Sequence, residues 1–192
     1  TKQAWFELQQ AQEAYLPGFE AGKIAYGHFQ DSPIHSFERT GALSNNKTYF
    51  VPTDDKSLLA FLNSKLAWFC FTSRTTAVRG GFFEATAQHM ETLPIAKGTD
   101  FQRAELGSLA EAAQAAAERR YALQQAITRR IPDLAVDPAN AKLTGKLKEW
   151  WNLPDFAAFQ KEVEKALKAR IPLQERNDWD NWITTSRAEI LA

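Results

Sequence analysis

The stretch that decides the fold is 58–95, LLAFLNSKLAWFCFTSRTTAVRGGFFEATAQHMETLPI. Its first part carries apolar residues at helical spacing, namely Leu58, Leu62, Leu66 and Phe69. N-cap side chains precede them, so the pattern predicts a packed helix over Asp55–Phe71. A basic turn with two glycines follows this helix. This turn is expected to lie at one edge of the domain and to present Arg74, Arg79, Gly80 and Gly81.

Short strands are predicted on the N-terminal side of this helix and after it. In Lys23–Gln30 (KIAYGHFQ), alternate residues fall on one side, as in a half-buried strand; they are Ile24, Tyr26 and His28. Further extended candidates are His35–Arg39, Thr48–Val51, Val78–Phe83 and Thr92–Ile95. We therefore expect an α+β fold in which a small mixed or antiparallel sheet packs against the helix.

Helices are predicted for the rest of the chain. A three-four spaced stripe of apolar residues predicts a long helix that begins at Asp100 and ends near Arg130, ahead of a proline. After a linker, Asp155 is positioned to cap one helix, and Glu175–Ala192 is predicted to form another. We expect a lobe at 1–98, a long connecting helix at 99–131 and a helical C-terminal region at 132–192.

Composition limits the classes of function. The 192 residues are 44% hydrophobic and 12% aromatic, which is typical of a globular chain. The 23 basic residues balance the 23 acidic residues, which argues against binding nucleic acid by charge alone. A single cysteine, Cys70, excludes an internal disulfide, and with no signal peptide a cytoplasmic setting is expected. Because Thr1 is not a natural start, we expect a longer parent protein.

Motifs for catalysis are missing from the sequence. It contains no NPP[YF] tetrapeptide, which an amino-methyltransferase uses to hold a flipped base, and no GxGxxG or P-loop. The Pro-Asp pairs at 132–133 and 154–155 lack the acidic-X-Lys triplet of a metal-dependent nuclease. One cysteine cannot build a Cys-rich zinc site, and the three histidines are scattered. We therefore expect neither catalytic residues nor a metal site in this chain.

Six segments, taken in order, resemble the TaqI-like C-terminal specificity domain of restriction-modification methyltransferases. They are Trp5–Leu8 (WFEL), Lys23–Tyr26 (KIAY), Asn45–Pro52 (NNKTYFVP), Leu58–Leu66 (LLAFLNSKL), Val78–Phe83 (VRGGFF) and Gln88–Ile95 (QHMETLPI). The tail Trp150–Trp182 is similar to the stretch after the recognition lobe in fused restriction-modification proteins. One departure is Phe83–Thr86 (FEAT), which follows the two glycines where the family often has a basic residue, and it argues against a phosphate-gripping role for this stretch.

The resemblance implies that 1–98 is a DNA target recognition lobe, which reads base edges of double-stranded DNA in the major groove. It also implies a parent chain, of the type IIG or phage-defence kind, whose methyltransferase domain binds S-adenosylmethionine and methylates adenine at N6. Mg²⁺ would be required if a nuclease is fused to that parent. For the chain itself we expect no cofactor and no membrane partner; its partners would be DNA and the methyltransferase domain.

The candidate DNA contacts are basic, polar and glycine residues of the matching segments and their turns. They are Lys23, His28, Gln30, Arg39, Lys47, Arg74, Arg79, Gly80 and Gly81. Such side chains bond base edges or phosphates, and glycines let backbone amides approach a phosphate closely. Each has an ordinary alternative, such as a solvated strand residue or a cation at a helix C-terminus. Asn63 and Ser64 are expected to bond within the helix and its neighbours.

Three other functions are compatible with the sequence. Half of a type I specificity subunit would share the LLNS pattern and the following helix. A helical protein-interaction module would use the alanine-rich stripe at 106–127 and the tryptophan-rich tail as a docking surface. A stand-alone enzyme is the least supported, because no catalytic constellation is present.

Overall fold

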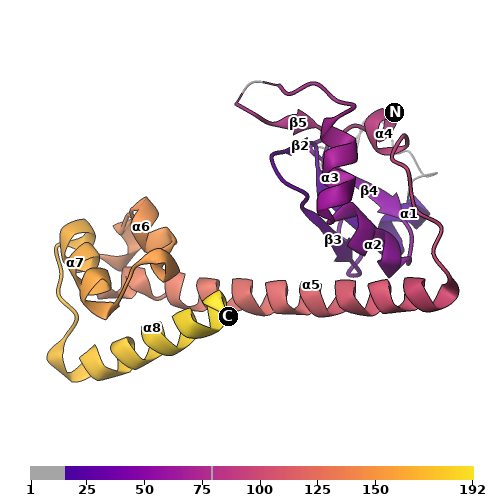
Figure 1. The fold of residues 1–192 in the computed structure, drawn as a ribbon. Coiled ribbons are helices and arrows are strands. Elements are labelled where there is room, and N and C mark those ends of the chain that lie inside the picture. Colours follow the sequence, from indigo (N-terminus) through magenta and orange to yellow (C-terminus); the bar gives the residue numbers. More distant parts are fainter. Residues whose placement is uncertain (1–15, 79) are drawn as a thin grey trace, which may run out of the picture. The chain divides into compact units, whose positions relative to one another are not determined.

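The computed structural model describes residues 16–78 and 80–192, which form two compact units. The first unit comprises Thr1–Gln114 and the second Ala115–Ala192. Figure 1 shows strands in the first unit and helices throughout. The α+β class predicted from the sequence is confirmed. Among the described residues, no helix is long and apolar enough to cross a membrane.

A three-stranded antiparallel sheet forms the centre of the first unit. Its strands are β1 (Lys23–Gly27), β3 (His35–Glu38) and β4 (Thr48–Pro52), in the order β3-β1-β4. A separate antiparallel pair joins β2 (Phe29–Gln30) to β5 (Phe83–Glu84). The strands predicted around 23–30, 35–39 and 48–51 are therefore confirmed. The predicted strand Thr92–Ile95 is wrong, since that segment is irregular and follows the short helix α4 (Ala87–Met90).

The helix predicted over 55–71 is two helices, α2 (Lys56–Leu62) and α3 (Lys65–Thr72). Asp55 caps α2, because its Oδ1 accepts from the backbone N–H groups of Ser57 and Leu58. The Ser64 hydroxyl caps α3 in the same way, accepting from the Ala67 amide at 3.0 Å. The prediction of one helix was wrong because the backbone becomes extended at Ser64, with φ −79° and ψ 153°. The side chain of Asn63, which ends α2, bonds strand β3.

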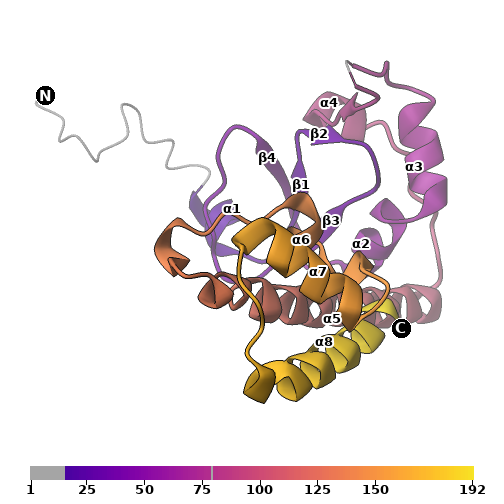
Figure 2. The same cartoon turned by 90° about the vertical axis from the view of Figure 1, so that its left-hand side faces the viewer.

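The core of the first unit lies between the sheet and these helices, which run beside it in Figures 1 and 2. Its buried apolar residues come from β1, β3, α2, α3, the first half of α5 (Asp100–Thr128) and the segments that follow β5 and α4. They are Ile24, Tyr26, Phe37, Leu59, Leu62, Phe71, Ala85, Leu93 and Ala110. The helix α1 (Leu16–Glu20) precedes β1 and has no buried residue. The predicted strands and helical faces thus supply one apolar core.

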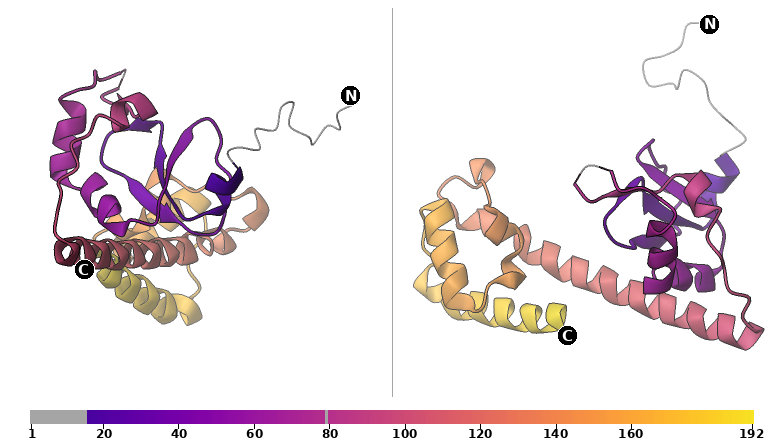
Figure 3. Two further views of the ribbon diagram at one scale, coloured as in Figure 1. Left: turned by 90° about the vertical axis from the view of Figure 1, so that its right-hand side faces the viewer. Right: turned by 45° about the horizontal axis from the view of Figure 1, so that its top comes forward.

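The second unit is helical. Its elements are the second half of α5, α6 (Gly145–Lys148), α7 (Phe156–Leu167), α8 (Arg176–Leu191) and the 3-10 turns η2 (Ile131–Leu134), η3 (Pro138–Asn140), η4 (Trp150–Asn152) and η5 (Leu173–Glu175). Figure 3 shows α6, α7 and α8 grouped at the C-terminal end of α5. As predicted, Asp155 caps α7, accepting from the Ala158 amide at 2.7 Å. Trp150 is fully buried in the core, and its Nε1–H donates to the Gln124 carbonyl. An ion pair of Arg119 with Glu189 joins α5 to α8.

Candidate nucleic-acid interface

The β2–β5 pair is the element around which several predicted site residues gather. Phe29 lies opposite Glu84, and Gln30 lies opposite Phe83. Because side chains alternate across a strand, Phe29 and Glu84 share one face of the pair. Gln30 is 5% exposed and Phe83 packs on the core, so the other face is the buried one. The face with Phe29 and Glu84 is turned to solvent; Phe29 is 48% exposed. We call this the β2–β5 face.

His28 is fixed at the edge of the β2–β5 face. Its backbone N–H donates to the Lys47 carbonyl at 2.9 Å, and its carbonyl accepts from the Ala85 amide at 2.7 Å. Its ring stacks on Phe29, with 4.3 Å between centroids, and meets the edge of Tyr49 at 5.3 Å. The ring Nε2 lies 2.7 Å from Oε1 of Glu84. These contacts hold the imidazole and the carboxylate in one arrangement.

Lys47 adds a cation to the β2–β5 face. It is exposed, and its Nζ lies 5.8 Å from the centre of the Phe29 ring. The turn before β4 is shaped by Asn45, whose Oδ1 accepts from the Lys47 amide at 2.9 Å. A cation beside an exposed aromatic ring is an arrangement that can contact both phosphates and bases.

The hairpin 77–83 continues from β5 and carries the glycine turn. The Val78 amide donates to the Phe82 carbonyl at 2.7 Å, and the Gly81 amide donates to the Val78 carbonyl at 3.3 Å. Gly80 and Gly81 both have positive φ, 85° and 80°, the left-handed region that favours glycine. Both are exposed, and the turn extends beyond β2 and β5 in Figure 1. The candidate Arg79 lies outside the described residues.

Arg74 lies just after the C-terminal end of α3. It is exposed, and its Nη1 donates to the Thr92 carbonyl at 3.2 Å, which ties the end of α3 to the segment after α4. The guanidinium has further donors beyond this bond. Arg74 can therefore serve both the structure and a ligand.

Three other candidates lie apart from the β2–β5 face or beneath it. Lys23 is 2% exposed, and its Nζ donates to Glu38 at 2.5 Å and to the Phe19 carbonyl at 2.7 Å. Arg39 is exposed but lies near the Glu38 end of β3, the opposite end from His28. Gln30 is buried and donates to the Gly27 carbonyl at 3.2 Å. Lys23 and Gln30 therefore have structural partners rather than free surface.

Two titratable side chains beneath the face have displaced pKa values. Burial lowers the pKa of His35 to about 4, and the nearby Asn63 side chain opposes this shift. Both ring nitrogens of His35 are buried without a hydrogen-bond partner among the described residues. Burial raises the pKa of Tyr26 to about 12, with smaller contributions from Tyr49 and Glu91. Both groups are therefore neutral near pH 7.

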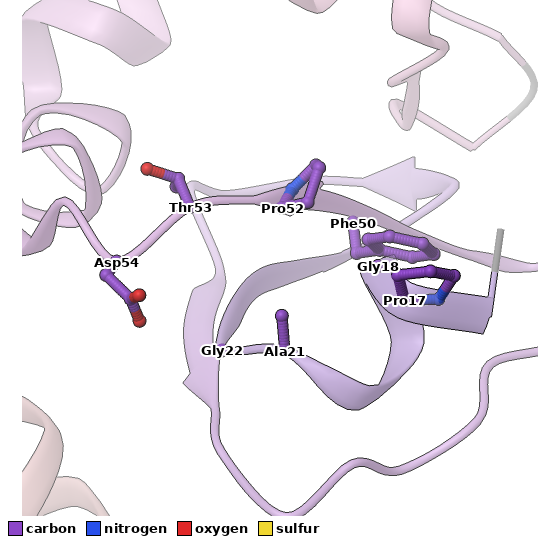
Figure 4. A pocket seen from close by; sticks show the side chains of 8 residues that line it. All are labelled: Pro17, Gly18, Ala21, Gly22, Phe50, Pro52, Thr53 and Asp54. Carbon is purple, nitrogen blue, oxygen red and sulfur yellow. The ribbon is translucent and has the colours of Figure 1, made fainter. Parts of the chain in front are cut away.

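Hollows also lie outside the β2–β5 face. A shallow hollow of 430 Å³ lies between α1 and the end of β4 (Figure 4). Proline, glycine, alanine and the ring of Phe50 line most of it, and Asp54 is the one charged side chain among its described lining residues. Within 16–78 and 80–192, no group of three or more His, Cys, Asp or Glu side chains is arranged to hold a metal ion.

Three residues of the β2–β5 face were not among the candidate contacts drawn from the sequence: Phe29, Tyr49 and Glu84. The alternation in KIAYGHFQ correctly assigns the residues of β1 to its two faces. The pattern continues through His28, however, where the chain has already left β1. Phe29 and Glu84 are 55 positions apart in the numbering and meet only through strand pairing. The pairing register would have been needed to find them.

Comparison with known families adds to this geometry. Residues 2–95 match the family model described as the TaqI-like C-terminal specificity domain. Residues 99–192 match the model of a domain of unknown function, DUF8810. No curated protein and no solved structure matches the chain significantly. The resemblance derived from six sequence segments is confirmed over residues 2–95, which match a specificity domain of the kind that restriction-modification enzymes carry.

Proposed function

We propose that this chain recognises a specific sequence in double-stranded DNA on behalf of an adenine-N6 methyltransferase. The family match over residues 2–95 is the observation that carries the proposal. The β2–β5 face supports it, because aromatic, basic and hydrogen-bonding side chains meet there on a rigid element. The parent would be a restriction-modification or phage-defence enzyme of the type IIG kind, working in the cytoplasm.

The shape of the pair suits the proposed ligand. The major groove of B-DNA is about 12 Å wide and admits a two-stranded β-ribbon. The two-residue β2–β5 pair, with the bridge between Ala77 and Phe83 beside it, would form the base of such a ribbon. Phe29 and the half-buried Glu84 of the pair, with Lys47 beside them, would then lie where base edges and phosphates are reached.

Phosphate contacts are assigned to the exposed cations and the glycine turn. Lys47 and Arg74 would contact the DNA backbone as cations, and the exposed glycine turn would let a phosphate approach the Gly80 amide closely. The Gly81 amide already donates to the Val78 carbonyl. Arg79 keeps its proposed role as a neighbouring phosphate contact. Arg39 would act only if DNA reaches the other end of β1. Lys23 and Gln30 are assigned to the framework of the lobe, because both side chains are buried.

The remaining parts of the enzyme would come from the parent chain. Its methyltransferase domain would supply the S-adenosylmethionine site and the base pocket, and a fused nuclease would add Mg²⁺. The zero net charge of the chain fits this division, since a lobe without basic excess gains from a partner that also holds the duplex.

One observation favours a second function, a docking role for residues 99–192. On the first half of α5, Phe101, Leu106 and Leu109 are 76%, 43% and 60% exposed. Such apolar exposure is typical of a surface that meets another protein. The partner could be the methyltransferase domain, or a second specificity lobe as in a type I subunit. A dimer that depends on concentration, without DNA affinity, would support this alternative.

The test is selection of bound duplexes from a randomised DNA pool by the whole chain, at low and moderate salt, followed by sequencing. We expect an enriched motif. Retention without enrichment would mean that the chain binds the backbone but needs the methyltransferase domain to read bases. Absence of retention at both salt concentrations would contradict the proposal and favour docking.

A further inference from the structure

Glu84 is an acidic residue on the face that we propose for DNA. A carboxylate facing a phosphate is repelled. On a DNA-binding face, Glu84 therefore needs a partner in the DNA other than a phosphate. Among the described residues, the group at hydrogen-bond distance from its carboxylate is the imidazole of His28. A role for Glu84 in contacting DNA rests on the proposed function, because the β2–β5 face must first meet the duplex.

The geometry leaves one carboxylate oxygen of Glu84 available. Oε1 lies 2.7 Å from Nε2 of His28, while Oε2 has no hydrogen-bond partner in the part of the chain that the structure describes. The side chain is 41% exposed. It lies across the strand pair from Phe29, so it belongs to the face that is turned to solvent. A ligand at this face can therefore reach Oε2.

The environment of His28 explains how the carboxylate is oriented. Its Nδ1 is buried and has no partner among the described residues. A ring with its proton on Nε2 donates a hydrogen bond to Glu84. Phe29 and Tyr49 hold the ring on two further sides. His28 thus fixes Glu84 without a contact of its own to the ligand, as a positioning residue.

The chemistry of base edges then selects the partner. In the major groove, cytosine N4 and adenine N6 amino groups are donors, whereas guanine O6 and N7 and thymine O4 are acceptors. A carboxylate oxygen accepts from the first two and repels the others. We propose that Glu84 reads one position of the DNA target by accepting a hydrogen bond from the exocyclic amino group of cytosine or adenine, and that His28 positions it.

The experiment repeats the randomised-pool selection with the whole chain and four variants. For Glu84→Ala we expect discrimination at one motif position to fall about tenfold, the range of a good base contact, with other positions unchanged. In Glu84→Gln the amide can also donate, so guanine and thymine are no longer excluded at that position. His28→Phe keeps the ring contacts but loses the hydrogen bond, and should weaken the same position. Glu91→Gln, an exposed carboxylate of the same lobe, is the matched control and should leave the motif unchanged.

The outcomes separate the two proposals. If the unaltered chain enriches no motif, the proposed function fails and this inference fails with it. If a motif is enriched but survives Glu84→Ala and Glu84→Gln, or if these variants lose affinity equally for all sequences, only the base-reading role is overturned. Should Glu84→Ala unfold, judged by circular dichroism, the isosteric Glu84→Gln decides. A weakening by His28→Phe spread over all positions would remove its positioning role.

Discussion

Asn63 closes the outer edge of β3 by pairing with the backbone of His35. Its Oδ1 accepts from the His35 amide at 2.9 Å, and its Nδ2 donates to the His35 carbonyl at 2.9 Å. Gln114 does the same at Phe37, with distances of 2.7 and 2.8 Å. Two side-chain amides thus take the place of a fourth strand and satisfy an edge that would otherwise offer unpaired backbone groups.

This pairing predicts a stability loss when the amide of Asn63 is altered. Asn63→Ala removes both hydrogen bonds and should lower the free energy of unfolding by about 1–2 kcal/mol, the usual net worth of one or two bonds at a partly hydrated site. Asn63→Asp keeps the acceptor but loses the donor, and should also destabilise. Urea unfolding of the whole chain measures the effect. Asn46→Ala, on an exposed turn, is the control; equal midpoints for Asn63→Ala and this control would contradict the role.

His35 predicts a pH dependence of stability. Its pKa is lowered from 6.5 to about 4 by burial, so between these values the folded protein binds fewer protons than the unfolded chain. Stability should therefore fall as pH decreases from about 6.5 to 4, by at most about 1.4 kcal/mol per pH unit. His35→Phe removes the titrating group and should flatten this part of the curve.

A second group makes the assignment to His35 testable. Hydrogen bonds from Lys23 and then Thr40 lower the pKa of Glu38 from 4.5 to about 2. Stability from Glu38 is present above 4.5 and is lost only as pH falls toward 2. Thermal unfolding of the unaltered chain and His35→Phe should therefore differ between pH 4 and 6.5 and run in parallel below. Parallel curves throughout would assign the loss to other groups.

Removing the charge of Lys23 should change stability, whereas removing the charge of Lys47 should change DNA binding. Lys23→Ala deletes the buried partner of Glu38 and should lower the melting temperature. Lys47→Ala should leave the melting temperature unchanged, because the side chain is exposed, while it weakens DNA binding equally for all sequences. The slope of log affinity against log salt should fall by about one unit for Lys47→Ala. Unchanged DNA affinity in Lys47→Ala would remove it from the interface.

Arg79→Ala is predicted to behave like Lys47→Ala. If Arg79 contacts a phosphate, affinity should fall uniformly across sequences and the salt slope should decrease by about one unit. A loss confined to one base position would make Arg79 a base-reading residue instead. Titration of labelled duplexes of varied sequence at several salt concentrations separates these results, and unaltered affinity would exclude both roles.

The predictable parts of the fold are those encoded locally. Alternation in 23–27, the cap at Asp55 and the cap at Asp155 each act within a few residues, so the sequence alone locates these elements. The break at Asn63 is different. Helical periodicity continues from α2 into α3, although the backbone becomes extended at Ser64. The side chain of Asn63, which ends α2, bonds His35, and that partner lies 28 residues earlier.

The candidate site divides in the same way. Lys47 and the glycines were identified because turn residues are recognisable from their types. Lysine is seldom buried, so the sequence offered no reason to withdraw Lys23 from the surface. The contact between His28 and Glu84 spans 56 residues and follows from the register of β2 with β5. Composition and motif order carry no information about that register.

The turn at Gly81 yields the last prediction. Gly81 has φ 80°, and a Cβ added there would meet nothing within 4 Å, so Gly81→Ala is opposed by backbone strain alone. The left-handed conformation costs an L-residue about 1–2 kcal/mol, so the hairpin should shift away from this geometry. We expect Gly81→Ala to reduce DNA affinity with little change in global unfolding, and Gly81→Asn to do so less, because asparagine tolerates positive φ. Gly145→Ala, equally open but without positive φ, is the control. Equal DNA affinity for Gly81→Ala and Gly145→Ala would show that binding does not depend on the shape of the turn.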